Sequence, residues 1–201
     1  REILFQRDER PIEVIPCCVD LDRFSTADGH SRDAMRRELG IGDRKALAYV
    51  GAFGGWYLTA EMADVFGEFK KVEPNGFALV LTQSSPNMIE PLLRERGFGQ
   101  NDLLIRKVSP SELPKYLSAA DLAVSFIKPC YSKQASSPTK NAEYLACGLP
   151  IIANSGIGDV DALIANNQIG GLVEEFTNES YSNVLNQISE LGDISDRCRE
   201  V

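Results

Sequence analysis

Blocks of apolar and mixed residues follow one another along the chain in a regular order. Short apolar runs predict strands that are covered on both faces; they lie at residues 45–53, 76–82, 102–108, 122–127, 150–154 and 169–174. Segments with helical spacing separate them, at residues 58–72, 86–97, 109–121, 138–147, 159–166 and 178–191. This alternation predicts an α/β fold, a Rossmann-like, doubly wound parallel sheet with helices on both faces.

Several residues mark where these helices begin and end. Ser109 is expected as an N-cap that forms a capping box with Glu112, with Pro110 as the first helical residue. Pro91 is expected to kink or split its helix. Residues 11–24 predict a strand and a turn, and residues 25–43 predict a solvated helix and a loop.

Composition limits the kind of partner. The chain has 201 residues, of which 43% are hydrophobic, and a net charge of −8 without any run of Lys and Arg. Nucleic acid is therefore not an expected partner, whereas a local pocket can still bind an anionic small molecule. The five cysteines form no CxxC motif and are expected to be reduced and mostly buried. No apolar run is long enough to span a membrane, and no metal site is expected.

The segment SSPTKNAEYLACG, residues 136–148, concentrates the candidate chemistry. Ser137 is expected as the N-cap of a helix over 138–147, with Pro138 first and Gly148 just past the end. The hydroxyls of Ser136, Ser137 and Thr139 and the Lys140 ammonium would then surround free N–H groups, which suits a phosphate.

Glu143 lies one turn further along and faces the same way as Lys140. Its carboxylate can accept hydrogen bonds from a vicinal diol such as a ribose. Phosphate donors beside a diol acceptor describe a nucleoside diphosphate. The alternative is an ordinary surface ion pair between the two side chains, worth about 0.2–0.5 kcal/mol.

Five phrases of the sequence carry a family resemblance. VIPCCVDLDRF, LAYVGAFGG, SPSELPKYLSAADLAVSF, PTKNAEYLACGLPIIAN and GIGDVDALIANNQIGGLV resemble, in the same order, the C-terminal domain of retaining glycosyltransferases of family 4, also called group 1. The resemblance covers roughly residues 12–190. It implies the C-terminal half of a GT-B fold, with residues 1–24 as the interdomain linker and first strand and residues 25–201 as the nucleotide-sugar (donor) binding domain. The chain begins without Met, and we expect its N-terminal acceptor domain to be absent.

The resemblance also implies roles for individual residues. Glu143 matches the glutamate that holds the donor ribose, and the turn through Ser136, Ser137, Pro138 and Thr139 matches the one that binds the diphosphate. Glycines of the loop after the first strand of the domain face the donor phosphates. The matching positions here are Gly51, Gly54 and Gly55, while Val108 lies where the family contacts the base.

Two positions depart from the family pattern. Ala135 stands where a first glutamate normally contacts the donor sugar, which puts sugar recognition in doubt. Ala52 stands where an arginine is expected, and the lysine that normally accompanies it is missing as well. Charge develops on the leaving diphosphate in the transition state. Lys140 and Lys133, on either side of the serine turn, are the expected replacements and the candidate catalytic residues.

The implied activity is transfer of a sugar, of hexosyltransferase type, from a nucleoside-diphosphate sugar to a hydroxyl acceptor, without a metal or other cofactor. Synthesis of a cell-surface polysaccharide is one expected role, in the cytoplasm or at the inner face of the membrane, with any peripheral membrane contact made by the missing half. The isolated chain is expected to be inactive without its N-terminal domain. Two alternatives stay open: half of a GT-B sugar-nucleotide epimerase, and a non-catalytic binding module of the same fold.

Overall fold

The computed structural model describes residues 15–201. The strands are β1 (Ala46–Val50), β2 (Phe77–Leu81), β3 (Leu103–Arg106), β4 (Leu122–Ser125), β5 (Ile151–Asn154) and β6 (Gly170–Val173). The α-helices are α2 (Gly29–Glu38), α3 (Thr59–Val72), α4 (Glu90–Glu95), α5 (Leu113–Leu117), α6 (Thr139–Ala146), α7 (Val160–Asn167), α8 (Asn178–Glu190) and α9 (Ser195–Arg199). Two 3₁₀ helices, η1 (Pro86–Met88) and η2 (Tyr131–Ala135), complete the elements.

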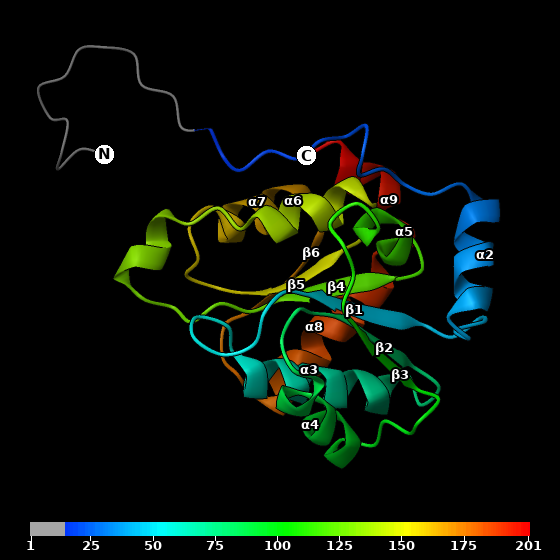
Figure 1. The fold of residues 1–201 in the computed structure, drawn as a ribbon. Helices are drawn as coiled ribbons and strands as arrows, with labels where there is room; N and C mark the ends of the chain where they lie inside the picture. The colour runs from blue at the N-terminus through cyan, green and yellow to red at the C-terminus, as the bar shows by residue number, and fades with distance from the viewer. Residues whose placement is uncertain (1–14) are drawn as a thin grey trace, which may run out of the picture.

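The sheet confirms the predicted fold class. Its six strands are all parallel and lie in the order β3-β2-β1-β4-β5-β6. Helices α3, α4 and α8 cover one face, and α5, α6, α7 and α9 cover the other (Figure 1). The chain therefore winds outward in both directions from the pair β1 and β4, the arrangement of a Rossmann-like doubly wound sheet.

Two apolar cores, one on each face, explain why the strands read as continuous apolar runs. Leu47 and Tyr49 of β1 point into the core beneath α3 and α8, whereas Ala46, Ala48 and Val50 point into the core beneath α5 and α6. Successive side chains of a strand alternate between faces, so both sets are buried.

Several predicted boundaries are corrected by the structure. The segment at 86–97 is split into η1 and α4. Pro91 lies in the first turn of α4, where the missing N–H of a proline costs no intrahelical hydrogen bond. Helix α5 begins at Leu113 rather than after Ser109, because residues 110–112 form a turn. In that turn the Glu112 carboxylate accepts from both the N–H (3.1 Å) and the hydroxyl (2.5 Å) of Ser109. The serine hydroxyl thus donates to the glutamate instead of capping the helix.

The first part of the chain also differs from expectation. Residues 15–24 contain a turn and no strand, and the rest of the strand predicted at 11–24 lies outside the described residues. The helix expected within 25–43 is present as α2, but it is not wholly solvated, because Met35 and Arg36 are buried. Of the five cysteines only Cys147 and Cys198 are buried, so the expectation of mostly buried thiols is wrong.

Candidate donor site at the carboxyl ends of the strands

The carboxyl ends of β1 and β4 lie side by side where the winding of the sheet reverses. Ligands of doubly wound sheets bind at this kind of switch point. Three segments extend from this edge, on the left in Figure 1. They are the loop at 51–58 after β1, the segment at 126–138 that contains η2, and the loop at 155–159 after β5.

The loop after β1 has the shape that its glycines allow. Gly51, Gly54 and Gly55 have φ values of 155°, 79° and 63°, which L residues with a side chain rarely adopt. A Cβ on Gly51 would lie 2.7 Å from the Tyr49 hydroxyl oxygen. The Gly54 N–H donates to the Thr59 hydroxyl at 3.1 Å, which fixes the loop on the start of α3. The three glycines therefore lie in one tight turn at the carboxyl edge of the sheet.

Helix α6 directs its N-terminus towards the same edge, but its cap differs from the prediction. Pro138 occupies the N-cap position and no side chain caps the helix. The predicted cap, Ser137, instead donates its hydroxyl to Asp159 Oδ2 at 3.0 Å and accepts from the Cys17 N–H at 3.0 Å. The N–H groups of Thr139 and Lys140 lie in the first turn and have no intrahelical partner. Because no side chain caps them either, they are available to an anion.

The end of α6 is as predicted. Gly148 has a φ of 76°, and its N–H donates to the Leu145 carbonyl at 2.8 Å. The Leu149 N–H donates to the Tyr144 carbonyl at 3.0 Å. These two bonds form a Schellman motif, which ends the helix before β5.

Lys140 and Glu143 face the same way, and in the ligand-free chain they bind each other. Lys140 Nζ lies 2.8 Å from Glu143 Oε2, and the two side chains are 37% and 13% exposed. The second carboxylate oxygen, Oε1, accepts no hydrogen bond from the part of the chain that the structure describes. The pair thus presents an ammonium beside the helix N-terminus and one free carboxylate oxygen one turn further along.

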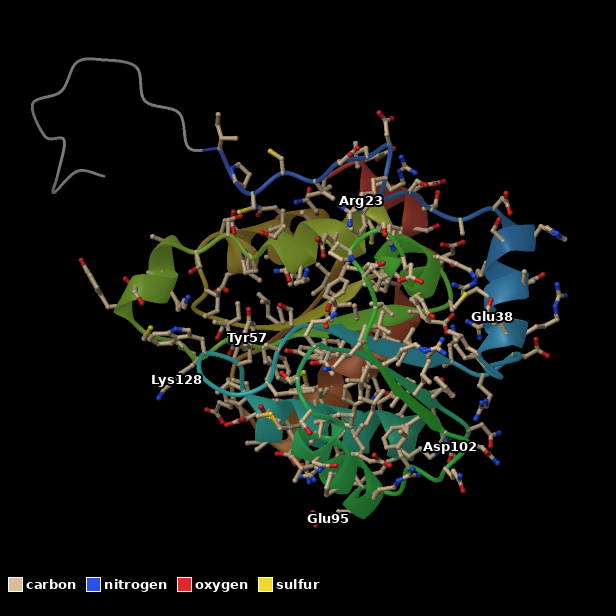
Figure 2. All side chains as sticks on the ribbon, viewed as in Figure 1. Arg23, Glu38, Tyr57, Glu95, Asp102 and Lys128 are labelled. Atoms are coloured by element: carbon tan, nitrogen blue, oxygen red, sulfur yellow. The ribbon has the colours of Figure 1, made fainter. Side chains whose placement is uncertain are left out.

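Lys133 lies in η2, just before the serine turn, with its ammonium over the Trp56 ring, 5.1 Å from the centroid. The backbone joins the same two loops, because the Lys128 N–H donates to the Trp56 carbonyl at 2.8 Å and Tyr57 forms an antiparallel bridge with Ile127. Figure 2 shows Tyr57 and Lys128 close together at this edge.

Val108 lies at the same edge but follows β3, which is separated from β4 by two strands. The side chain is half-buried and packs against the core. Its carbonyl accepts from Gln83 Nε2 at 2.8 Å, so a base would have to share or displace that contact. Ala135 is the last residue of η2, and it is exposed.

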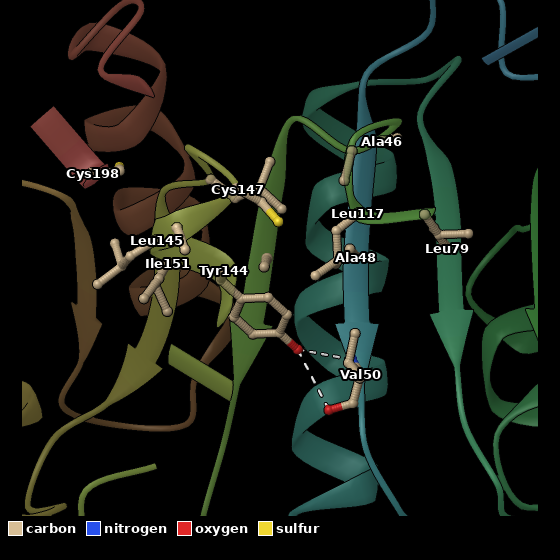
Figure 3. Close-up of a cluster of buried hydrophobic side chains, with 14 of the residues drawn as sticks. Ala46, Ala48, Val50, Leu79, Leu117, Tyr144, Leu145, Cys147, Ile151 and Cys198 are labelled. Carbon is tan, nitrogen blue, oxygen red and sulfur yellow. Dashed lines mark hydrogen bonds between the residues drawn. The ribbon is translucent and has the colours of Figure 1, made fainter. Parts of the chain in front are cut away.

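Two buried polar side chains that position the site were missed by sequence reasoning. The Tyr144 hydroxyl accepts from the Val50 N–H at 2.8 Å, which ties α6 to the residue before the glycine turn (Figure 3). Its complete burial raises the pKa of Tyr144 well above its usual value, so the hydroxyl stays protonated. Asn154 Oδ1 accepts from the Ile127 N–H at 2.8 Å and fixes the segment that leads into η2. The sequence offered a signal only for Asn154, because it is a polar residue at the end of the apolar run PIIAN.

A cavity lies at the opposite edge of the sheet. It has a volume of about 600 Å³ and is lined by residues at the amino ends of β1, β4 and β5 together with α8 and α9. The candidate binding residues at the carboxyl edge instead lie on the loop at 51–58, the segment at 126–138 and the start of α6. Among residues 15–201 no three His, Cys, Asp or Glu side chains are grouped to hold a metal ion, and no helix has the length and apolar character needed to cross a membrane.

Comparison with protein families gives a match over residues 31–201 to the family described as glycosyl transferases group 1. The chain belongs to this family. The family recognised from the motifs is thereby confirmed, and with it membership of a transferase family. No curated protein matches the sequence significantly.

Solved structures confirm the fold. WaaG, a glycosyltransferase involved in lipopolysaccharide biosynthesis, is 20% identical with a TM-score of 0.70, over 94% of this chain and 51% of its own. The C-terminal domain of LpcC from Francisella tularensis is 18% identical with a TM-score of 0.69, over 90% of this chain and 95% of that domain. HepE from Anabaena, solved in complex with UDP-glucose, is 15% identical with a TM-score of 0.70, over 90% of this chain and 49% of its own. The chain thus spans about half the length of WaaG and HepE, and its sheet is that of one half of a GT-B glycosyltransferase.

Proposed function

We propose that the chain is the donor-binding domain of a retaining glycosyltransferase that moves a hexose from a nucleoside-diphosphate sugar to a hydroxyl acceptor. The observation that carries this proposal is the position of Lys140 and Glu143 on α6. They lie beside the uncapped helix N-terminus, at the switch point of the sheet. The acceptor site belongs to an N-terminal domain of the same polypeptide, and a cytoplasmic role in making a cell-surface polysaccharide fits the family.

The donor diphosphate binds the free N–H groups of Thr139 and Lys140 and the Lys140 ammonium. Glu143 accepts from the ribose diol through the oxygen that Lys140 leaves free. As the bond to the sugar breaks, negative charge grows on the leaving phosphate. Lys140, with Lys133 on the other side of the serine turn, stabilises that charge.

Calorimetric titration of the 201-residue chain with UDP, GDP and ADP tests the binding half of the proposal. One of the three binds, and Lys140→Ala weakens it by about 10–100-fold, the range expected for hydrogen bonds to a charged group. Lys115→Ala is the matched control, because Lys115 pairs with Glu38 on the exposed surface of α5. Absence of binding by all three nucleotides contradicts the proposal and favours a non-catalytic module.

The role of Glu143 is tested by changing the carboxylate of the protein and the diol of the ligand, separately and together. Glu143→Ala weakens binding of the ribonucleotide but leaves the affinity for its 2′,3′-dideoxy analogue unchanged, since the analogue has no diol to donate. Equal losses for both ligands assign Glu143 to holding Lys140 rather than the ribose.

The catalytic half is tested on the polypeptide that includes the N-terminal domain. Lys140→Ala lowers turnover there, and NMR of the product shows the anomeric configuration of the donor retained. Measurable transfer by the 201 residues alone contradicts the assignment of the acceptor site to the other domain, and net epimerisation of the donor identifies an epimerase.

A further inference from the structure

Trp56 is a large exposed side chain on a backbone that is held on several sides. It is the only tryptophan of the chain and is 52% exposed. Its carbonyl accepts from the Lys128 N–H, and the turn around it is closed by the Tyr57 N–H, which donates to the Gly54 carbonyl at 3.1 Å. The loop therefore presents the indole to solvent from a fixed position, which leaves its apolar surface accessible to a ligand.

One face of the indole is already occupied. The Lys133 ammonium lies 5.1 Å from the ring centroid, within the range of a cation–π contact. Neither Lys133 nor Lys128 forms an ion pair with any residue in 15–201. Lys133 thus supports the ring from one side, and the exposed area of Trp56 is left for a partner.

The order of groups along α6 indicates which partner this is. A nucleotide sugar is linear, with the diphosphate between the ribose and the sugar. If the ribose lies at Glu143 and the diphosphate at the first turn of α6, the sugar extends towards η2, which directly precedes that turn. Trp56 contacts η2 through Lys133. Ala135, at the end of η2, has a methyl side chain that can neither donate nor accept a hydrogen bond, so recognition there needs another residue.

We propose that Trp56 is the stacking platform for the pyranose ring of the donor, and that Lys133 positions it. This inference rests on the proposed function and assigns the sugar subsite within it. The apolar C–H face of a hexose covers the indole, while its hydroxyls stay towards solvent and the serine turn. Trp56 then determines which donors bind by the shape of the face they present.

Because Trp56 is the only tryptophan, its fluorescence reports on this subsite without labelling. The 201-residue chain is titrated with the nucleoside diphosphate that binds it and with the matching diphosphate-hexose. The hexose compound changes the emission of Trp56 more strongly than the diphosphate does. An equal change with both ligands means that the base or phosphate, not the sugar, meets the indole, and overturns the platform while the proposed function stands. No binding of either ligand overturns both.

Substitution separates stacking from charge. Trp56→Leu weakens the diphosphate-hexose by about tenfold and leaves the diphosphate unchanged, whereas Trp56→Phe retains most of the affinity. Tyr131→Leu is the control, because Tyr131 is 89% exposed in η2, the 3₁₀ helix that contains Lys133. Calorimetry measures all three. A loss for Trp56→Leu that is the same for both ligands also overturns the platform.

Lys133 is tested as a positioning residue by the mobility of the indole. In Lys133→Ala the time-resolved fluorescence anisotropy of Trp56 decays faster in the free protein, and the hexose compound loses affinity relative to the diphosphate. Lys133→Arg, which can stack on the ring, restores both readouts. Unchanged anisotropy in Lys133→Ala overturns this part of the proposal.

Discussion

At the amino ends of the strands, Arg32 and Arg36 converge on Asp121, whereas at the carboxyl ends Lys128 and Lys133 have no ion pair among residues 15–201. Asp121 accepts from Arg32 at 2.7 Å, from Arg36 at 3.2 Å and from the Ala46 N–H at 2.7 Å. Arg32, Arg36 and Asp121 thus neutralise one another within the fold, whereas the ammonium groups of Lys128 and Lys133 are left without a carboxylate partner among the described residues.

The contrast shows how a cluster of charge can be assigned. Arg36 also donates to the carbonyls of Ala119 at 2.7 Å and Gly42 at 2.9 Å, so it ties α2 to the sheet. Its guanidinium thus makes four hydrogen bonds within the fold. Lys140 has a partner as well, but Glu143 leaves one of its own oxygens unused. Unused donors and acceptors, rather than charge itself, separate the candidate binding edge from the structural one.

The largest expected difference between the edges is in thiol reactivity. Cys147 lines the cavity at the amino edge, where burial raises the pKa of its thiol to about 12. Cys130 lies at the carboxyl edge, where a hydrogen bond with the Ser132 hydroxyl lowers the pKa of its thiol from the usual cysteine value. At pH 8 only about one Cys147 thiol in 10,000 is ionised, since each pKa unit is a factor of ten, so Cys147 is expected to react far more slowly than Cys130.

Alkylation with iodoacetamide, read at each cysteine by mass spectrometry, checks this difference. Cys198 serves as the internal control, because burial also raises the pKa of its thiol to about 12. Above pH 9.0 the thiols of Cys147 and Cys198 ionise in the unfolded chain but stay protonated in the folded one. The stability that each buried thiol contributes is therefore fully present below pH 9.0 and is lost as the pH rises towards 12. Equal rates at Cys130 and Cys147 contradict the contrast.

The next largest effect is expected from Arg36→Ala at the amino edge. The substitution leaves the Asp121 carboxylate short of one partner and several carbonyls without a donor. Loss of one member of a buried pair costs about 3–5 kcal/mol. Urea unfolding measures it, and Arg37→Ala is the neighbouring control, because Arg37 is exposed and should change stability by less than about 0.5 kcal/mol. Similar values for the two variants would assign Arg36 to the solvated surface.

A smaller effect is expected from Tyr144→Phe near the carboxyl edge. It removes the acceptor of the Val50 N–H and is expected to cost about 1–3 kcal/mol, the penalty for an unsatisfied buried donor. Hydrogen exchange at the Val50 amide, together with urea unfolding, checks both the site and the size of the change. Tyr131→Phe, at an exposed position, is the control. An unchanged exchange rate at Val50 is the result that contradicts the assigned bond.

Sequence patterns predicted the fold better than the detailed contacts of the site. Apolar runs separated by helical spacing were enough to predict the doubly wound sheet, because burial on both faces leaves no alternation along a strand. The glycines of the first loop were also predictable, since φ values such as that of Gly54 exclude most residues. The pairing of Lys140 with Glu143 was one of two open interpretations, and the ligand-free structure shows that pair without testing the other.

The failures involve tertiary partners that local signals cannot reveal. Ser137 reads as a helix cap, but Asp159, 22 residues later, takes its hydroxyl. Arg36 reads as a solvated residue of α2, but Asp121 and three carbonyls bury it. In each case the competing partner is distant in sequence, so only the folded chain identifies it.

The pairing of β1 with β4 has a consequence for how the chain folds. Leu47 of β1 pairs with Leu122 of β4. The chain between these two strands contains β2 and β3, which pair on the other side of β1. Contacts between such distant residues form slowly, because a long loop has to close before they stabilise anything. The two loops of the candidate donor site come together only at this step. During synthesis, nucleotide binding should therefore appear late, and it would report that the centre of the sheet has closed.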